Sequence, residues 1–409
     1  MSDLLKSLRS EQLLYNIEND SPLSFDEYQR FAVGTDKTQE FAPGRAAIRY
    51  LSLGLFGEAG SLLSELKKKI RDNEAYNEFA RVQIEEFGDV LWYLTVAGTK
   101  LDLSLQQIVE AALKQDIPQH VYRGKATPRT FIELQLSPPT VIRLEDAQDA
   151  LLKLGSHVGM LLEDTRLSLT DTTDHELFKS SLASIFRYML FAADSGGVSV
   201  ADAAEENIRK TVSRWPMQRT PLPRFDLTAI PEEQFPDNIE MTFRQKISGE
   251  KKYVYQSWRG VNIGDRLTDN ASEEDDFRFH DVFHLSYYAI LGWSPVLRAL
   301  LRLKRKSQPK IDEVEDGARA ILIEEGISTW IFNHSKELHF YDGIRSLDYG
   351  LLKAIERLVV GFEVEKVKLW QWEEAILRGY GVFRELRKNQ GGIVIADLEH
   401  RSISFKAQS

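Results

Sequence analysis

The sequence predicts an all-α protein built from helical bundles, with a small β-hairpin at its carboxyl end. Residues 24–114 carry apolar residues at helical spacing almost throughout, and residues 145–215 are helical in the same way. The last block, from about residue 240 to 409, is also mostly helical. It ends in a glycine pair and an apolar run, after which residues 397–405 alternate between apolar and polar as strands do.

Composition limits what the chain does. Its 409 residues are enough for two or three domains. A formal net charge of −10 argues against a nucleic-acid partner, because nucleic-acid-binding surfaces are normally basic. The absence of cysteine excludes disulfides, thiolate metal sites and cysteine nucleophiles. No apolar run reaches about 18 residues and no signal peptide is evident, so we expect a cytoplasmic protein without membrane contact.

The first helices have recognisable ends. Ser24 and Glu27 fit a capping box, in which the two side chains satisfy free backbone N–H groups at the start of a helix. A second helix is expected from about residue 43 to 71, and a third from about residue 75 to 101. Ser104 follows a short turn and is the expected N-cap of a fourth helix.

Carboxylates stand among the apolar residues of the second and third helices. Glu58 lies in the second helix, and Glu86 and Asp89 lie three residues apart in the third, where a helix stacks them on one face. Burying carboxylates together is costly unless a cation neutralises them. Mg²⁺ prefers oxygen ligands and binds through carboxylates and substrate phosphates. The sequence therefore predicts a magnesium site between two helices, and phosphate chemistry as its use.

Three motifs of the first block resemble one known family. Residues 54–60 read GLFGEAG, residues 64–69 read SELKKK, and residues 85–94 read EEFGDVLWYL. They resemble the MazG-like all-α nucleoside triphosphate pyrophosphohydrolases, strongly over about residues 22–115 and more weakly over residues 145–216. In that family an ExxE pair and an ExxD pair hold Mg²⁺, which activates water against the α-phosphorus of a nucleotide. The resemblance implies hydrolysis of a nucleoside triphosphate to the monophosphate and pyrophosphate, with Mg²⁺, or Mn²⁺ in its place, as cofactor.

The resemblance also assigns the metal ligands. Glu86 and Asp89 match the ExxD pair, whereas Glu58 matches only the first position of ExxE. Ser61 stands where the second carboxylate is expected, and a serine hydroxyl is a weak, neutral ligand. Glu65, two turns beyond Glu58, is the candidate to supply the missing oxygen. The alternative is a site that holds fewer metal ions, or holds them more weakly.

Other residues near the two motifs have candidate roles. Glu85, next to the ligand set, is a candidate base, or else a residue that supports the ligands from behind. Tyr28 and Trp92 are candidates for a base pocket. The candidates for phosphate contacts are Lys67, Lys68 and Arg71. The alternative for the basic and acidic residues of this block is that they form ion pairs on the helix surface.

The second helical block repeats the first. When Tyr93 is set against Tyr188, residues 85–105 align with residues 180–200 without a gap, and apolar and turn positions coincide. We interpret this as an internal duplication, with a coincidence between two amphipathic helix pairs as the alternative. The second copy lacks the acids: Glu86 corresponds to Ser181 and Asp89 to Ser184, and Glu58 corresponds to His157 when Gly60 is set against Gly159.

The last helix of the second copy carries cationic residues instead. Its Asn207, Lys210 and Arg214 share one face, in a spacing that resembles the phosphate-contacting helix of the family. The corresponding residues of the first copy carry no charge, and they are Ala112, Gln115 and Gln119. We therefore predict a composite site, in which the first copy binds Mg²⁺ and the second binds the triphosphate. The alternative is that Lys210 and Arg214 only cap a helix end.

Proline marks the boundary of the last block. Five prolines between residues 216 and 236 predict an extended connector. The predicted domains are a catalytic bundle (1–125), a degenerate repeat (140–216), a Pro-rich linker (217–240) and a helical C-terminal domain (241–409).

The C-terminal domain contains a second candidate site. His280, Asp281 and His284 form an HDxxH motif, and two histidines four residues apart on a helix share a face, as metal-ligand pairs do. Glu324, in a later apolar helix, is the candidate for a further carboxylate. The alternative is that these histidines are buried residues bonded to acids such as Glu324.

Two other functions stay open. In the first, Ser61 has exchanged turnover for nucleotide sensing, in a regulatory or defence protein. In the second, His280, Asp281 and His284 are the centre of a separate metal-dependent hydrolase. A fused pair of copies can be self-sufficient or can pair again, so a homodimer of the whole chain stays open too.

Overall fold

The chain folds into two compact units, Met1–Gln218 and Arg219–Ser409. The computed structural model describes residues 12–42, 45–115, 122, 127–135, 142–164, 172–216 and 218–408. Pro43, the expected start of the second helix, and Gln119 lie outside the described residues. Within these ranges, no helix has the length and apolar character needed to span a membrane.

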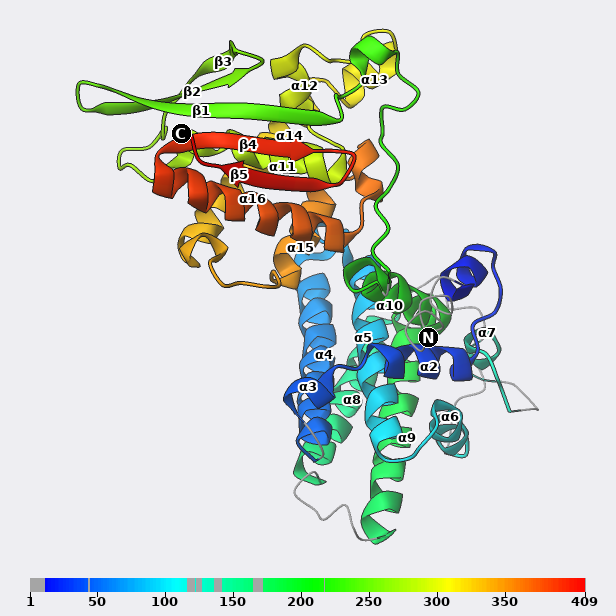
Figure 1. The fold of residues 1–409 in the computed structure, drawn as a ribbon. Coiled ribbons are helices and arrows are strands. Elements are labelled where there is room, and N and C mark those ends of the chain that lie inside the picture. The colour runs from blue at the N-terminus through cyan, green and yellow to red at the C-terminus, as the bar shows by residue number, and fades with distance from the viewer. Residues whose placement is uncertain are drawn as a thin grey trace. The chain divides into compact units, whose positions relative to one another are not determined.

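The described part of the first unit is built from helices (Figure 1). They are α2 (Phe25–Thr35), α3 (Thr38–Phe41), α4 (Arg45–Asp72), α5 (Phe79–Lys100), α6 (Leu105–Leu113), α7 (Phe131–Leu134), α8 (Leu144–Asp164), α9 (Thr172–Ser195) and α10 (Val200–Arg214). Two hairpins of long helices, α4 with α5 and α8 with α9, form the bundle, and α4 also packs against α8. The shorter helices cross over, because α6 packs against α9 while α10 packs against α5.

Apolar stripes on the four long helices meet in one core. Leu62 of α4, Leu91 of α5, Leu154 of α8 and Phe186 of α9 are all completely buried in it. Burying such a side chain contributes about 1.5–3 kcal/mol relative to leaving it exposed. The helical spacing of the apolar residues therefore accounts for the bundle.

Serine caps fix where the helices begin. The Ser24 hydroxyl accepts the Glu27 N–H at 3.2 Å, and the Glu27 carboxylate accepts the Ser24 N–H at 3.0 Å, so the predicted capping box is confirmed. Ser104 caps α6 through the same reciprocal bonds with Gln107. Ser199 caps α10 by accepting a backbone N–H at 3.1 Å. Ser104 and Ser199 correspond in the alignment of the two copies, so α6 and α10 begin at equivalent positions.

The second unit contains a five-stranded antiparallel sheet, and the all-α expectation is wrong there. The strands are β1 (Asn238–Ser248), β2 (Lys251–Trp258), β3 (Val261–Leu267), β4 (Gly391–Asp397) and β5 (Ser402–Lys406), in the order β3-β2-β1-β4-β5. In β1, Ile239, Met241 and Phe243 are buried and alternate with more exposed residues, which is the period of a half-buried strand. The expected terminal hairpin is confirmed as β4 and β5, which form one side of this larger sheet.

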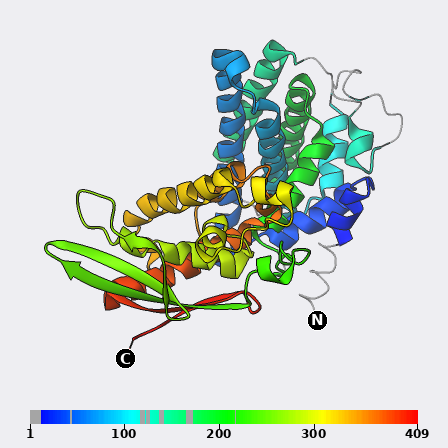
Figure 2. The ribbon, with the colours of Figure 1, turned by 90° about the horizontal axis from the view of Figure 1, so that it is seen from above.

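Helices cover one face of the sheet (Figure 2). They include α11 (Asp281–Leu291), α12 (Pro295–Leu301), α13 (Pro309–Val314), α14 (Ala318–Lys336), α15 (Tyr349–Leu358) and α16 (Leu369–Asn389). Both α11 and α16 pack against β4 and β5, and α11 also contacts α14. The core of this unit lies between these helices and the inner face of the strands.

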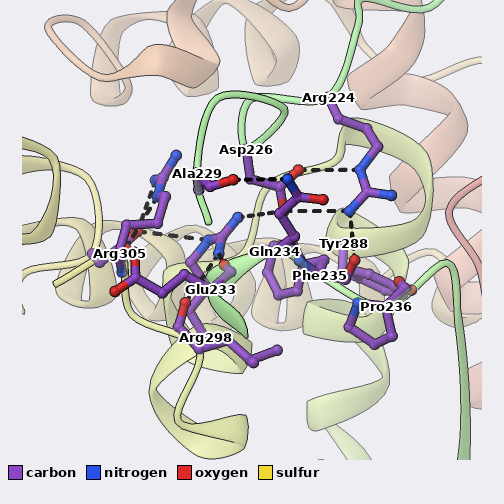
Figure 3. A network of polar contacts seen from close by, with 12 residues as sticks. Arg224, Asp226, Ala229, Glu233, Gln234, Phe235, Pro236, Tyr288, Arg298 and Arg305 are labelled. Atoms are coloured by element: carbon purple, nitrogen blue, oxygen red, sulfur yellow. Dashed lines mark hydrogen bonds and ion pairs between the residues drawn. The ribbon is translucent and has the colours of Figure 1, made fainter. Parts of the chain in front are cut away.

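The segment before β1 packs into the second unit through a polar network (Figure 3). Its Asp226 carboxylate accepts a bond from the Arg298 guanidinium of α12 at 3.0 Å, and both side chains are almost fully buried. Arg224 donates to the same carboxylate at 3.1 Å. Arg298 also donates to the Glu233 carbonyl at 2.9 Å, at the end of the short 3₁₀ helix η2 (Pro231–Glu233). Buried charges that are paired in this way tie the proline-rich stretch to the helices.

Candidate functional site

Three carboxylates from the first hairpin converge. Glu58 of α4 and Glu86 and Asp89 of α5 each offer an oxygen, and these oxygens all lie within 4.8 Å of one another. Glu86 and Asp89 share a face because they are three residues apart on α5. The three side chains are half-buried. The structure thus brings together the acids that the two motifs supply.

Glycines let the surrounding helices come close. A Cβ atom on Gly54 would lie 2.2 Å from Cε1 of Tyr93, so only glycine leaves room for that ring over α4. A Cβ atom on Gly88 would lie 2.5 Å from the Ala203 carbonyl oxygen and 2.9 Å from Cβ of Asn207. Gly88, between Glu86 and Asp89, therefore allows α10 to rest directly on α5.

Polar residues of α10 reach the carboxylates. The Asn207 side-chain amide donates to Asp89 Oδ1 at 2.9 Å. Lys210 forms an ion pair with Asp89, and its ammonium lies 3.3 Å from Glu85 Oε1. The buried Tyr28 hydroxyl donates to Asn207 Oδ1 at 3.0 Å, which fixes the direction in which the Asn207 amide points. Glu85 thus contacts the cation and is not one of the three converging acids.

Burial and the neighbouring charges shift the pKa values of the carboxylates and of Lys210. Burial, the charge of Glu58 and a hydrogen bond to Glu58 raise the pKa of Glu86 to about 8. Burial and the charge of Asp89 raise the pKa of Glu58. Burial also raises the pKa of Asp89, although Lys210 acts to lower it. Burial alone would lower the pKa of Lys210, but the charges of Asp89 and Glu85 outweigh it and raise that pKa.

This donor set fits a hard divalent cation. It offers carboxylate oxygens only, which is the preference of Mg²⁺ and Mn²⁺. Lys210 contacts two of the four carboxylates, Asp89 and Glu85, and the raised pKa of Glu86 favours its protonated form at neutral pH. A divalent ion would add positive charge and release the proton.

Other predicted residues are placed elsewhere. Glu65 is about 10 Å along α4 from Glu58, because seven residues of helix separate them. Its carboxylate is bonded by Lys68 at 2.5 Å and by the Tyr76 hydroxyl, and it is not part of the converging group. Arg71 pairs with its neighbour Asp72 at the exposed end of α4. Lys67 is exposed on the same helix.

Three other candidate residues, Trp92, Arg214 and Tyr28, make defined contacts in the structure. The indole N–H of Trp92 donates to the Thr35 hydroxyl at 3.0 Å. The Arg214 guanidinium of α10 stacks over the Trp215 ring, 4.4 Å from its centroid. Tyr28 is completely buried beneath Asn207. Tyr28 thus supports the site from below, a role that its position in the sequence does not indicate.

The second hairpin contains a cavity at the corresponding place. A volume of about 370 Å³ between α8 and α9 is lined by His157, Ser181 and Ser184, the residues that align with the three acids. The Gln115 amide, just after α6, donates to the Ser184 hydroxyl at 3.4 Å. Gln115 and Ser184 correspond to Lys210 and Asp89, so a neutral contact stands where the first hairpin has an ion pair.

The HDxxH motif of the second unit also forms a group. His280, Asp281 and His284 offer ligand atoms within 4.8 Å of one another, and all three are buried. Glu324 accepts from His284 Nδ1 at 2.8 Å and lies behind the ring. The carboxylate that faces the other ring nitrogen is Glu325, with Oε2 3.6 Å from Nε2. Adjacent glutamates point in different directions on a helix, and the sequence does not say which one faces the histidines.

Comparison with known proteins finds a family match over the second unit. Residues 220–409 match the family model described as the MazG C-terminal domain. The Gene 37 protein of Mycobacterium phage L5 is 31% identical over 70 residues, which are 17% of this chain and 61% of that protein. The chain thus covers less than two thirds of this relative's length. No solved structure matches the chain. The match over residues 220–409 supports the MazG-like character that the motifs of the first block indicate.

Proposed function

We propose that the first unit hydrolyses a nucleoside triphosphate to the monophosphate and pyrophosphate with the help of Mg²⁺ or Mn²⁺. One observation carries the proposal: the carboxylates of Glu58, Glu86 and Asp89 converge beside Lys210 of α10, the helix that follows the second hairpin. Carboxylates suit the metal, and a buried ammonium suits the phosphates that bind to that metal. The resemblance of the motifs to the MazG-like family and the family match of the second unit support this reading.

Different residues would bind the metal, bind the phosphates and orient these ligands. Glu58, Glu86 and Asp89 would hold the ion, which on binding lowers the pKa of water and stabilises charge on phosphate oxygens. Lys210 supplies a buried positive charge for the phosphates, and Glu85 holds its ammonium in place. Asn207 fixes the orientation of Asp89, and Tyr28 fixes that of Asn207. In the reaction water adds to the α-phosphorus, the bond from that phosphorus to the bridging oxygen of pyrophosphate breaks, and a proton is released.

The composite site rests on an internal duplication. The crossing of the short helices supports it, since α10 packs against α5 of the first hairpin and α6 packs against α9 of the second. The contact of Lys210 with Asp89 and that of Gln115 with Ser184 occupy corresponding positions. In this proposal the last helix of each copy packs against the hairpin of the other copy. Only one of the two resulting sites has kept both the anionic metal ligands and the cationic residue for phosphate.

Ser61 favours a second candidate, a nucleotide sensor with negligible turnover. Ser61 is half-buried on α4, where the family places a fourth carboxylate. One negative charge fewer weakens the hold on metal. The sensor would bind a nucleoside triphosphate through the same residues without cleaving it.

A nucleotide panel tests both candidates. Full-length protein is incubated with each nucleoside triphosphate and Mg²⁺ or Mn²⁺, and pyrophosphate release and nucleotide binding are measured in parallel. We expect release by the wild type, loss in Asp89→Ala, and wild-type release in the matched variant Ser184→Ala. Tight binding without release would establish the sensor, and activity in Asp89→Ala would exclude the proposed site.

A further inference from the structure

The two histidines of the HDxxH motif are held in the same way. His280 Nδ1 lies 2.8 Å from the Phe277 carbonyl oxygen, and His284 Nδ1 lies 2.8 Å from Glu324 Oε1. Both partners are acceptors, so each Nδ1 carries the proton. A neutral imidazole with its proton on Nδ1 has its lone pair on Nε2. Nε2 is therefore the nitrogen of each ring that a metal ion would bind, in place of any proton it shares with the neighbouring carboxylate.

Glu324 is anchored for this supporting role. Its carboxylate also accepts from the Ser294 hydroxyl at 2.7 Å and from the Val296 N–H at 2.8 Å, and it is completely buried. A carboxylate behind a histidine, bonded to the nitrogen that does not bind metal, is the usual second layer of a metal site. The bond between His284 and Glu324 thus orients the ring and leaves Nε2 available.

A carboxylate oxygen lies close to each Nε2 atom. Among the described residues, His284 Nε2 is buried and has no hydrogen-bond partner, with Glu325 Oε2 as the nearby carboxylate oxygen at 3.6 Å. His280 Nε2 lies 3.0 Å from Asp281 Oδ1, and Gln256 donates to the other oxygen of that carboxylate. Ligands at about 2.1 Å from a tetrahedral metal lie about 3.4 Å apart, and these separations bracket that value.

We propose that His280, Asp281, His284 and Glu325 bind one divalent transition-metal ion in the second unit. Two imidazoles and two carboxylates favour Zn²⁺, Mn²⁺, Fe²⁺ or Co²⁺ over Mg²⁺, which prefers oxygen ligands alone. Three of the ligands are buried, whereas the Glu325 side chain is 39% exposed and leaves a way in from solvent. The ion would join the start of α11, at His280 and Asp281, to α14, which carries Glu325. This site is independent of the carboxylate group in the first unit.

Metal titrations of the full chain test the proposal. The protein is stripped with a chelator, and Zn²⁺ and Co²⁺ binding is measured by calorimetry and by Co²⁺ absorption in excess Mg²⁺, in an Asp89→Ala background that disables the first group. We expect one ion per chain with the absorption of a nitrogen-ligated, low-coordinate Co²⁺. Glu325→Gln should weaken binding at least about tenfold.

The controls separate a ligand from a structural residue. His334→Gln alters another histidine on α14, whose Nδ1 contacts the Tyr341 hydroxyl at 2.9 Å, and should bind like the parent protein. His284→Gln should abolish binding, and if it does not fold, Glu325→Gln decides, because that side chain is partly exposed. Absence of Zn²⁺ and Co²⁺ binding in the parent, or equal binding in Glu325→Gln, would overturn the proposal.

Discussion

Two helix pairs of the first unit, α5 with α10 and α9 with α6, pack in corresponding ways but differ in the residues that meet. The first pair joins Asp89 to Lys210 and Asn207, whereas the second joins Ser184 to Gln115. Both pairs keep the apolar residues on which the packing depends. At these corresponding positions the first pair has charged groups and the second has neutral ones, so the same packing of helices accommodates either set.

The two pairs also differ at the point of closest approach. Gly88 brings the backbone of α10 against α5, because any Cβ there would overlap the Ala203 carbonyl. In the second pair the corresponding residue is Ala183, which is buried. In the pair of α5 and α10, this close approach lets the short Asn207 side chain reach the Asp89 carboxylate on the neighbouring helix.

The largest expected effect comes from removing a carboxylate. Glu86→Ala deletes one of three converging ligands, and we expect pyrophosphate release to fall by about 10³-fold, or about 4 kcal/mol in the activation barrier. The corresponding change in the second copy, Ser181→Ala, should leave the rate unchanged. Initial rates at saturating Mg²⁺ and nucleotide measure both. Equal rates in the two variants would show that the acids of α5 are not used.

The next effect concerns helix packing. Gly88→Ala places a Cβ 2.5 Å from a backbone oxygen, and we expect the free energy of unfolding to fall by about 2–3 kcal/mol. Gly57→Ala, on the exposed side of α4 with no atom within 4 Å of the new Cβ, should stabilise the protein by about 0.5–1 kcal/mol. Urea unfolding measures both. A tolerated Gly88→Ala would mean that α10 does not rest on α5 as described.

A smaller effect is expected at the amide that links the helices. Asn207→Ala removes the bond to Asp89 and leaves the Tyr28 hydroxyl without its strongest acceptor, so the free energy of unfolding should fall by about 1–2 kcal/mol. Pyrophosphate release should fall about tenfold because Asp89 loses its orientation. Tyr28→Phe removes only the outer bond, and its effect on both quantities should be smaller. A larger effect of Tyr28→Phe than of Asn207→Ala would contradict the chain of hydrogen bonds from Tyr28 through Asn207 to Asp89.

The smallest effect is on the pH dependence of stability without metal. The pKa of Glu86 rises from 4.5 to about 8 on folding, so between these values the folded chain binds a proton that the unfolded chain releases. The contribution of this protonation to the free energy of unfolding is therefore fully present below pH 4.5 and is lost as the pH rises through 8. Solvent screens this half-buried site, so we expect a loss of about 1 kcal/mol.

Thermal unfolding in chelator between pH 5 and 8.5 measures this dependence. Glu86→Gln cannot titrate and should flatten the profile, whereas Ser181→Ala should keep the slope of the wild type. A profile that rises over this interval in the wild type would contradict the repulsion among the three acids.

Local and helical features could be predicted from the sequence. The capping box at Ser24 follows from residue types three positions apart, the N-cap at Ser104 follows from its residue type after a turn, and the shared face of Glu86 and Asp89 follows from the helix period. The meeting of α10 with the carboxylates needed the alignment of the two copies. It could be proposed because one copy had the acids and the other had the cations.

Contacts between distant segments could not be predicted in this way. The pairing of β1 with β4 joins Met241 to Val394, and no local pattern indicates a partner so far along the chain. The alternation of buried and exposed residues in β1 was missed, because the block was predicted to be mostly helical. The Glu65 carboxylate is held by a hydrogen bond from the Tyr76 hydroxyl, and Tyr76 lies outside the motif. From the sequence, Glu324 was the candidate for a further carboxylate ligand. In the structure it is Glu325 that faces Nε2 of His284.

The most direct test of the composite site is a comparison of Lys210→Ala with Gln115→Ala. Both changes shorten a side chain that contacts the other hairpin, Lys210 within α10 and Gln115 just after α6, but only Lys210 contacts carboxylates. Pyrophosphate release by Lys210→Ala should fall at least about tenfold, with a raised KM for the nucleotide, while Gln115→Ala keeps the wild-type values. Unchanged turnover and KM in Lys210→Ala would show that the second copy takes no part in the site.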